Sequence, residues 1–176
     1  MSSDIVLAAA TSPNEVDEVR ALCWAYRDFL LTNSDVDRDI TETFYPEDIY
    51  RDLMDRLPVL HARPKGIMLL ARDASGQTVG CGMTQALDAD TAEIKRVFVT
   101  DKARGKGVAA ELCQALMTQA QADGFKRIVL DTSKELKAAQ RLYTRLGFQA
   151  RGPYQPIPQG ILPVLMFYER RLEDLS

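Results

Sequence analysis

The chain has 176 residues, of which 46% are hydrophobic and 27% are charged, a balance typical of soluble globular proteins. This length suits one domain over residues 1–176, and we expect no signal peptide and no membrane partner, since no apolar run approaches the roughly 20 residues of a spanning helix. The net charge of −3 argues against nucleic acid as a partner, and three cysteines without C-x-x-C spacing predict a cytoplasmic protein.

Hydrophobic periodicity and turn signals predict both strands and helices along the chain. Ser12 and Glu15 form a capping box that begins the first helix, and the polar stretch at residues 32–42 predicts a loop. The expected strands are residues 5–10, 66–73, 77–87, 92–99, 126–132, 148–150 and 163–171, and the expected helices begin at residue 13 and span 46–57, 104–123 and 136–146. This order predicts an α/β fold with a mixed sheet of about seven strands and about four flanking helices.

The charge is unevenly spread along the chain. Residues 1–64 hold thirteen acidic and six basic residues, whereas residues 65–176 hold twelve acidic and sixteen basic residues. This pattern is either scatter on a solvated surface or an anion site in the second part and a cation-friendly surface in the first.

The acidic stretch Ser34–Asp39 has D-x-D-x-D spacing, which raises the question of a metal site. Ile40 and Pro46 stand where a calcium-binding loop needs glycine and glutamate, which excludes an EF-hand. His61 is the one histidine and has no companion ligands in sequence. We therefore expect no metal.

A basic turn with two glycines follows the fourth predicted strand. Glycines let the backbone approach a ligand closely, and the helix that begins there directs free N–H groups and a partial positive charge at it. Arg104 and Lys106 add full charges beside Gly105 and Gly107, so the turn predicts a phosphate or pyrophosphate site. The turn lacks the G-x-x-x-x-G-K-[ST] pattern of P-loops, and Ala110 stands where a dinucleotide-binding fingerprint needs a third glycine.

Two segments resemble signatures of the GNAT superfamily of N-acetyltransferases. Arg104, Gly107 and Ala109 match the first, fourth and sixth positions of its [RQ]-x-x-G-x-[GA] motif for acyl-CoA pyrophosphate. The run A-A-Q-R-L-Y-T-R-L-G-F at residues 138–148 is similar to the family's A-x-x-L-Y-x-x-x-G-F segment. The resemblance covers most of the chain and is specific over residues 92–149.

This resemblance implies a GNAT-like, splayed β-sheet whose cleft holds the pantetheine arm of acetyl-CoA, the cosubstrate. It also implies that the acetyl group passes to an amine by direct attack on the thioester. The residues implied to bind acetyl-CoA are Val97, Phe98 and Val99, through their backbone, and then Arg104, Gly105, Lys106, Gly107, Val108 and Ala109.

Two residues are candidates for proton transfer. An alkylamine with a pKa of about 10.4 arrives charged and must lose a proton, and the thiolate of CoA must gain one. Family members with an A-E-I-type strand place a general base where Glu93 stands here; the alternative is a surface glutamate paired with Lys95 or Arg96. A neighbouring lysine weakens a base, so Lys95 must point away or be engaged elsewhere. Tyr143 matches the family's general acid; the alternative is a core aromatic.

The acceptor is encoded by no motif, so both small-molecule and peptide amines are open. In the family, the region of Ser34–Asp39 lies over the acceptor site, so its carboxylates either form a solvated loop or attract a cationic substrate. Residues 61–66 and 152–163, the latter with Tyr154, either line the acceptor pocket or are plain connections. A homodimer is possible, as for many relatives. The alternative to an enzyme is a non-catalytic CoA-binding regulatory module.

Overall fold

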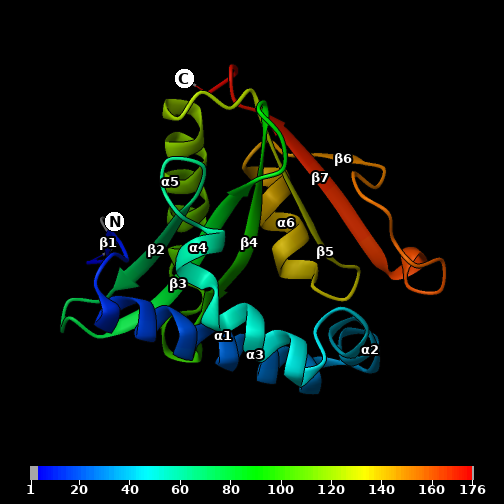
Figure 1. Ribbon diagram of the computed structural model, residues 1–176, viewed down its shortest axis with the longest axis horizontal. Helices are drawn as coiled ribbons and strands as arrows, with labels where there is room; N and C mark the ends of the chain where they lie inside the picture. Colours follow the sequence, from blue (N-terminus) through cyan, green and yellow to red (C-terminus); the bar gives the residue numbers. More distant parts are fainter. Residues whose placement is uncertain (1–3, 176) are drawn as a thin grey trace.

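Seven strands form one mixed sheet in the computed structural model, which describes residues 4–175. They are β1 (Val6–Ala9), β2 (Ile67–Arg72), β3 (Thr78–Ala86), β4 (Thr91–Val99), β5 (Arg127–Ser133), β6 (Gln149–Arg151) and β7 (Leu165–Arg171). Their order is β1-β2-β3-β4-β5-β7-β6, and all neighbours are antiparallel except β4 and β5, which are parallel (Figure 1). The predicted α/β fold with a mixed, seven-stranded sheet is confirmed.

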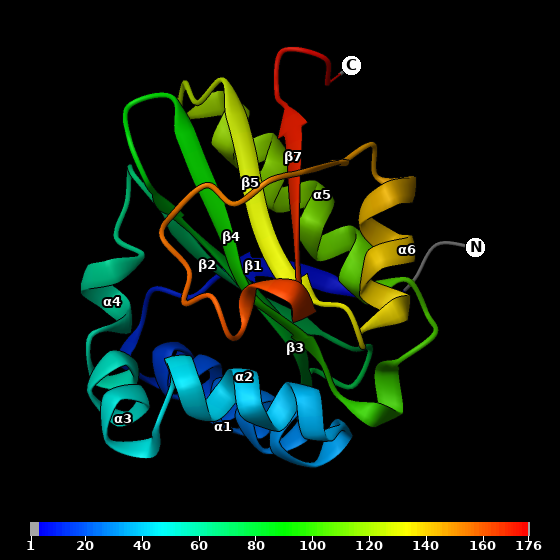
Figure 2. The ribbon, with the colours of Figure 1, turned by 90° about the vertical axis from the view of Figure 1, so that its right-hand side faces the viewer.

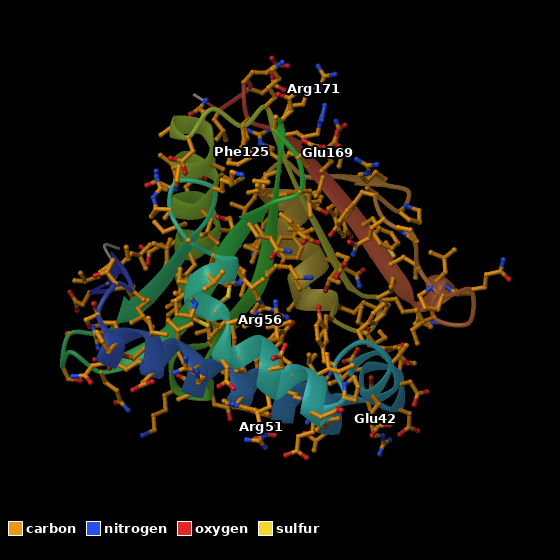
Figure 3. The ribbon with its side chains drawn as sticks, viewed as in Figure 1. Glu42, Arg51, Arg56, Phe125, Glu169 and Arg171 are labelled. Carbon is orange, nitrogen blue, oxygen red and sulfur yellow. The ribbon has the colours of Figure 1, made fainter. Side chains whose placement is uncertain are left out.

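Helices cover both faces of the sheet. The α-helices are α1 (Pro13–Asn33), α2 (Asp35–Phe44), α3 (Glu47–Asp55), α4 (Leu57–Leu60), α5 (Val108–Ala122) and α6 (Lys137–Arg145). α5 and α6 pack on one face, and α1, α3 and α4 pack on the other (Figure 1 and Figure 2). Charged side chains such as Arg51 on α3 and Glu42 on α2 point outwards (Figure 3). No helix within residues 4–175 has the length and apolar character needed to cross a membrane.

The stretch at residues 32–42, predicted as a loop, is helical instead. α1 continues to Asn33, and Ser34 then adopts an extended conformation that separates α1 from α2. The Oγ of Ser34 accepts a hydrogen bond from the backbone N–H of Asp37 at 3.0 Å and so caps α2. The acidic residues of the first turn of α2 favour the positive end of its dipole. The polar residues that suggested a loop are the serine cap and the acidic first turn of α2.

Two other helix boundaries differ from the prediction. The helix expected over 46–57 is divided into α3 and α4, because Pro58 has no N–H for an uninterrupted helix and fits the first turn of a new one. The helix expected over 104–123 begins only at Val108, because Gly107 has a φ of 80°, outside the helical range. The chain therefore has six α-helices in residues 4–175 rather than about four.

Side chains of β2 alternate between two cores. Ile67 and Leu69 pack on the face of the sheet that α5 covers, whereas Met68 and Leu70 pack on the face that α1 covers. Both faces of the central strands are therefore buried, as expected where helices cover both sides of a sheet. The functional consequence is that an opening between two of these strands leads into the interior of the protein.

Such an opening lies between β4 and β5. Only Thr91–Glu93 pair with Arg127–Val129, and the two strands then diverge (Figure 1). On its other edge, β4 remains paired with β3, but the register shifts at a bulge. Arg96 lies in this bulge with a φ of 51°, a left-handed conformation that residues other than glycine rarely adopt. The edge of β4 from Ile94 onward thus faces a gap rather than a strand.

Candidate active site

Two cavities meet where β4 and β5 diverge. The first, of about 240 Å³, is bounded by the two strands, α5 and α6. The second, of about 100 Å³, is bounded by the same strands, α1 and α2. Six residues line both cavities: Tyr26, Ile94, Arg96, Asp131, Thr132 and Leu136. Two ligands, one in each cavity, would therefore meet across these side chains.

The first cavity runs along the open edge of β4. Val97, Phe98 and Val99 line it, together with Ala109 in the first turn of α5. No strand within residues 4–175 pairs with this edge, so the backbone groups of β4 that point into the gap and are not engaged by β3 or Arg104 are available to the amides of a ligand. Val108, by contrast, is 1% exposed and packs into the core beneath α5.

The basic turn before α5 places one of its cations at the first cavity. The guanidinium carbon of Arg104 lies 4.8 Å from the centre of the Phe29 ring, and its Nε donates to the Val99 carbonyl at 3.1 Å. Arg104 also forms an ion pair with Asp101. Lys106 lines a separate hollow, so the structure does not bring the two cations together at the first cavity.

Gly105 and Gly107 give the turn its shape. Both have positive φ, 77° and 80°, which glycine adopts without the steric penalty of a side chain. No described atom lies within 4 Å of a Cβ built at either position, so the space beside both glycines is open. The first N–H groups of α5 have no partners within the helix, and the turn therefore suits an anion.

A buried carboxylate cluster lies behind the junction of the cavities. Glu93 is 1% exposed, and its carboxylate accepts hydrogen bonds from Gln85 Nε2 at 2.9 Å and from the Tyr154 hydroxyl at 2.6 Å. The same hydroxyl lies 3.4 Å from Asp131 Oδ2. Tyr154 therefore links the two carboxylates, and the loop 152–163 contributes to the site rather than serving only as a connection.

Asp131 lines both cavities, whereas Glu93 lines neither. Burial raises the pKa of Asp131; Lys95 opposes this rise and Glu93 adds to it. A carboxyl whose pKa moves toward neutrality is a better proton acceptor at neutral pH. The sequence prediction missed Asp131. Parallel pairing of Glu93 with Val129 was the signal that could have found it, because Asp131 is two residues later and shares that face.

Lys95 does not point away from Glu93. Its Nζ lies 3.7 Å from Glu93 Oε2 and also donates to the Tyr45 hydroxyl at 3.3 Å. Burial by itself lowers the pKa of Lys95, but Tyr45, Glu93 and Asp131 outweigh burial and raise it, so the side chain is charged at neutral pH. The condition that we set for Glu93 as a base, that Lys95 point away or be engaged elsewhere, is therefore not met, since Lys95 contacts Tyr45 but still pairs with Glu93.

Tyr143 of α6 is both a packed aromatic and a lining residue of the first cavity. It is 8% exposed, and its ring packs edge-on against Phe148 and lies against Tyr168. Burial raises the pKa of Tyr143 well above its ordinary value, so the phenol carries its proton at neutral pH. The two interpretations of this residue are therefore compatible, since a core position leaves its hydroxyl proton in place for donation.

His61 holds the side chain of Arg96. It is 2% exposed, its Nδ1–H donates to the Thr84 carbonyl at 2.8 Å, and its Nε2 accepts from the Arg96 guanidinium at 2.8 Å. Arg96 also contacts Met83 Sδ at 3.4 Å. Burial and the Arg96 charge lower the pKa of His61 to about 4, so the ring is neutral and accepts from Arg96. Across residues 4–175, no three His, Cys, Asp or Glu side chains gather as a metal site.

Comparison with known proteins identifies the family to which this arrangement belongs. Residues 31–148 match the acetyltransferase (GNAT) family, a span that includes the open edge of β4, the basic turn and Tyr143. The chain belongs to the GNAT acetyltransferase family.

Individual GNAT relatives match over most of the chain. An N-acetyltransferase of Schizosaccharomyces pombe is 28% identical over 90% of this chain and 93% of its own length. An IAA acetyltransferase of Azospirillum brasilense is 35% identical over 63% of this chain and 71% of its own length. The GNAT phosphinothricin acetyltransferase of Sinorhizobium meliloti, solved in complex with AcCoA, superposes with a TM-score of 0.69 at 19% identity, covering 96% and 88% of the two chains. These comparisons confirm the GNAT-like fold.

The buried, neutral state of His61 predicts a pH dependence of stability. The unfolded chain protonates His61 near pH 6.5 and the folded one near pH 4, so the free energy of unfolding falls as pH decreases between these values, by about 2 kcal/mol at pH 5. His61→Gln keeps one donor and one acceptor but does not titrate. Denaturant unfolding at pH 7 and pH 5 should show a smaller loss for His61→Gln than for wild type, and equal losses would contradict the buried neutral ring.

Proposed function

We propose that this protein is an N-acetyltransferase that moves the acetyl group of acetyl-CoA onto a small-molecule amine. The observation that carries the proposal is the junction of two cavities, one along the open edge of β4 and one beneath α2, with Asp131 in the wall of both. The second cavity is small, at about 100 Å³, which favours a small acceptor over a peptide. The Azospirillum relative, whose name gives a small molecule, supports the same choice.

In this proposal, acetyl-CoA lies along the first cavity. The edge of β4 at 97–99 bonds the pantetheine arm through backbone groups, as a strand would. Arg104, the N–H groups of residues 105–109 and the dipole of α5 hold the diphosphate. Lys106, which lines a separate hollow, contributes only the longer-range attraction of its charge. Binding of this kind needs no metal.

The chemistry is a direct acyl transfer. The amine nitrogen attacks the thioester carbon, a C–N bond forms and the C–S bond breaks. The proton lost by the amine passes to Asp131. The Tyr154 hydroxyl donates to Glu93, and its oxygen, 3.4 Å from Asp131 Oδ2, accepts a hydrogen bond from the protonated Asp131, which connects Glu93 to the proton. Tyr143 donates its proton to the departing thiolate, and a backbone N–H of the 97–99 edge stabilises the oxyanion.

A thiol-release assay with acetyl-CoA and a panel of small amines and peptides tests this function. We expect release of CoA thiol in proportion to acetylated amine, with small amines preferred. Binding of acetyl-CoA in a calorimetric titration, without transfer to any amine, would contradict the enzyme and leave the non-catalytic CoA-binding module.

Tyr143→Phe should keep the fold and the affinity for acetyl-CoA but lower kcat by roughly 100-fold, the low end of general-acid contributions. The reason is that the variant retains the ring that packs against Phe148 and loses only the proton. Turnover and acetyl-CoA affinity are measured on the same preparation. An unchanged kcat would assign Tyr143 to the core alone.

The carboxylates should differ in how their loss depends on pH. Asp131→Asn should lower kcat/KM most at low pH, with partial rescue at high pH, because an amine with a pKa of about 10.4 then loses its proton unaided. Glu93→Gln should show the same trend with a smaller loss, since it acts through Tyr154. Full pH profiles of both variants check this. A loss that is flat across pH would mean that the residue orders the site and moves no proton.

A further inference from the structure

The acceptor cavity contains a carboxylate oxygen that the protein itself leaves without a partner. Asp37, on α2, is 1% exposed and lines the second cavity. Its Oδ2 accepts a hydrogen bond from Asn33 Nδ2 at 2.6 Å. Its Oδ1 is buried and has no hydrogen-bond partner among the described residues. Buried carboxylate oxygens are rarely left unbonded because losing water costs free energy, so a missing donor is expected here.

The cations that line this cavity are engaged elsewhere. Lys95 Nζ lies between Glu93 and the Tyr45 hydroxyl. The Arg96 guanidinium is held by His61 and Met83. No ion pair to Asp37 occurs within residues 4–175, so its Oδ1 is open to a donor on a ligand in the cavity.

Asp37 lies away from the thioester end of the cavity. Asp131 lines both cavities, whereas Asp37 lines only the second. Tyr26 lines both cavities, and burial and then the charges of Asp131, Tyr45 and Asp37 raise its pKa. An acceptor whose attacking nitrogen is at Asp131 therefore presents a different group to Asp37.

We propose that Asp37 Oδ1 binds a second, cationic N–H group of the acceptor, and that the acceptor is a short aliphatic diamine. One nitrogen lies at Asp131, where it loses its proton and attacks, and the other remains charged at Asp37. A small cavity of about 100 Å³ whose wall holds two separate carboxylates, Asp131 and Asp37, matches a small molecule with two cationic groups. This inference rests on the proposed function, because it assigns the acceptor of that same site.

The other acids of α2 do not share this role. Asp35 pairs with Arg38, and Asp39 is exposed to solvent. Glu42 points outwards (Figure 3). The stretch Ser34–Asp39 was expected either to be solvated or to attract a cationic substrate, and of its acids only Asp37 faces the cavity. Asp39→Asn is therefore a matched control for Asp37→Asn.

The test compares three acceptors of equal chain length: putrescine, butylamine and γ-aminobutyrate. With wild type, kcat/KM for putrescine should exceed that for butylamine by roughly 10- to 100-fold, the range expected for a hydrogen bond to a charged group. Asp37→Asn should remove this difference by acting on putrescine alone, and Asp39→Asn should retain it. Asp37→Asn removes a first-turn acid from α2, so its Tm is measured with its activity, and the ratio of putrescine to butylamine within one preparation does not depend on any change in Tm.

Two outcomes would overturn the inference while leaving the transferase intact. Wild type could acetylate butylamine as well as putrescine, or it could prefer γ-aminobutyrate, which would assign the second contact to an anion. Neither outcome depends on the folding of a variant. If no amine releases CoA thiol, the proposed function fails. A thermal-shift titration with putrescine then tests the cation site separately. Stabilisation of wild type but not of Asp37→Asn supports the site, and stabilisation of neither protein overturns it.

Discussion

The separation of β4 from β5 after three paired residues is the constraint on which the site depends. If β4 and β5 stayed paired along their length, their backbone groups would bond to each other and the gap that the two cavities occupy would be closed. The bulge at Arg96 lies in the part of β4 that β5 leaves unpaired, and its left-handed conformation costs roughly 1–2 kcal/mol for a residue other than glycine. His61 and Met83 hold the side chain of Arg96, which lines both cavities. The neutral ring of His61 is thus connected to the shape of the cleft, although it touches neither substrate.

Charge differs between the two cavities. Arg104 and the start of α5 line only the first cavity, where an anionic diphosphate fits, and Asp37 lines only the smaller one, where a cationic amine fits, while Asp131 and Arg96 line both. Lys95 is charged but lies beside Glu93, which keeps its field from acting alone on the acceptor. The uneven charge along the sequence therefore has a spatial counterpart, because the acidic first third supplies α2 and the more basic remainder supplies the turn before α5.

The parts of the site that the sequence predicted are those formed by residues close together along the chain. The basic turn with Gly105 and Gly107 and the helix with Tyr143 are contiguous segments, and their residue types and spacing reflect backbone conformation and side-chain direction within a few residues. Glu93 was identified by its place on one strand. Its long-range partners were not, because Tyr154 arrives from a loop some sixty positions away along the chain. Asp131 became visible only through the register of β5 against β4. α2 was mistaken for a loop because its polar surface is that of a capped helix whose single inward acid is Asp37.

The central claim is that the gap between β4 and β5 holds acetyl-CoA, and a calorimetric titration of acetyl-CoA tests it most directly. Ala109 lines the gap at the start of α5, whereas Ala122 lies exposed at the other end of the same helix, so tryptophan at each position forms a matched pair. The account predicts that Ala122→Trp binds acetyl-CoA as wild type does and that Ala109→Trp binds roughly 10- to 100-fold more weakly, the scale of overpacking a filled site. Wild-type affinity in Ala109→Trp would contradict the account.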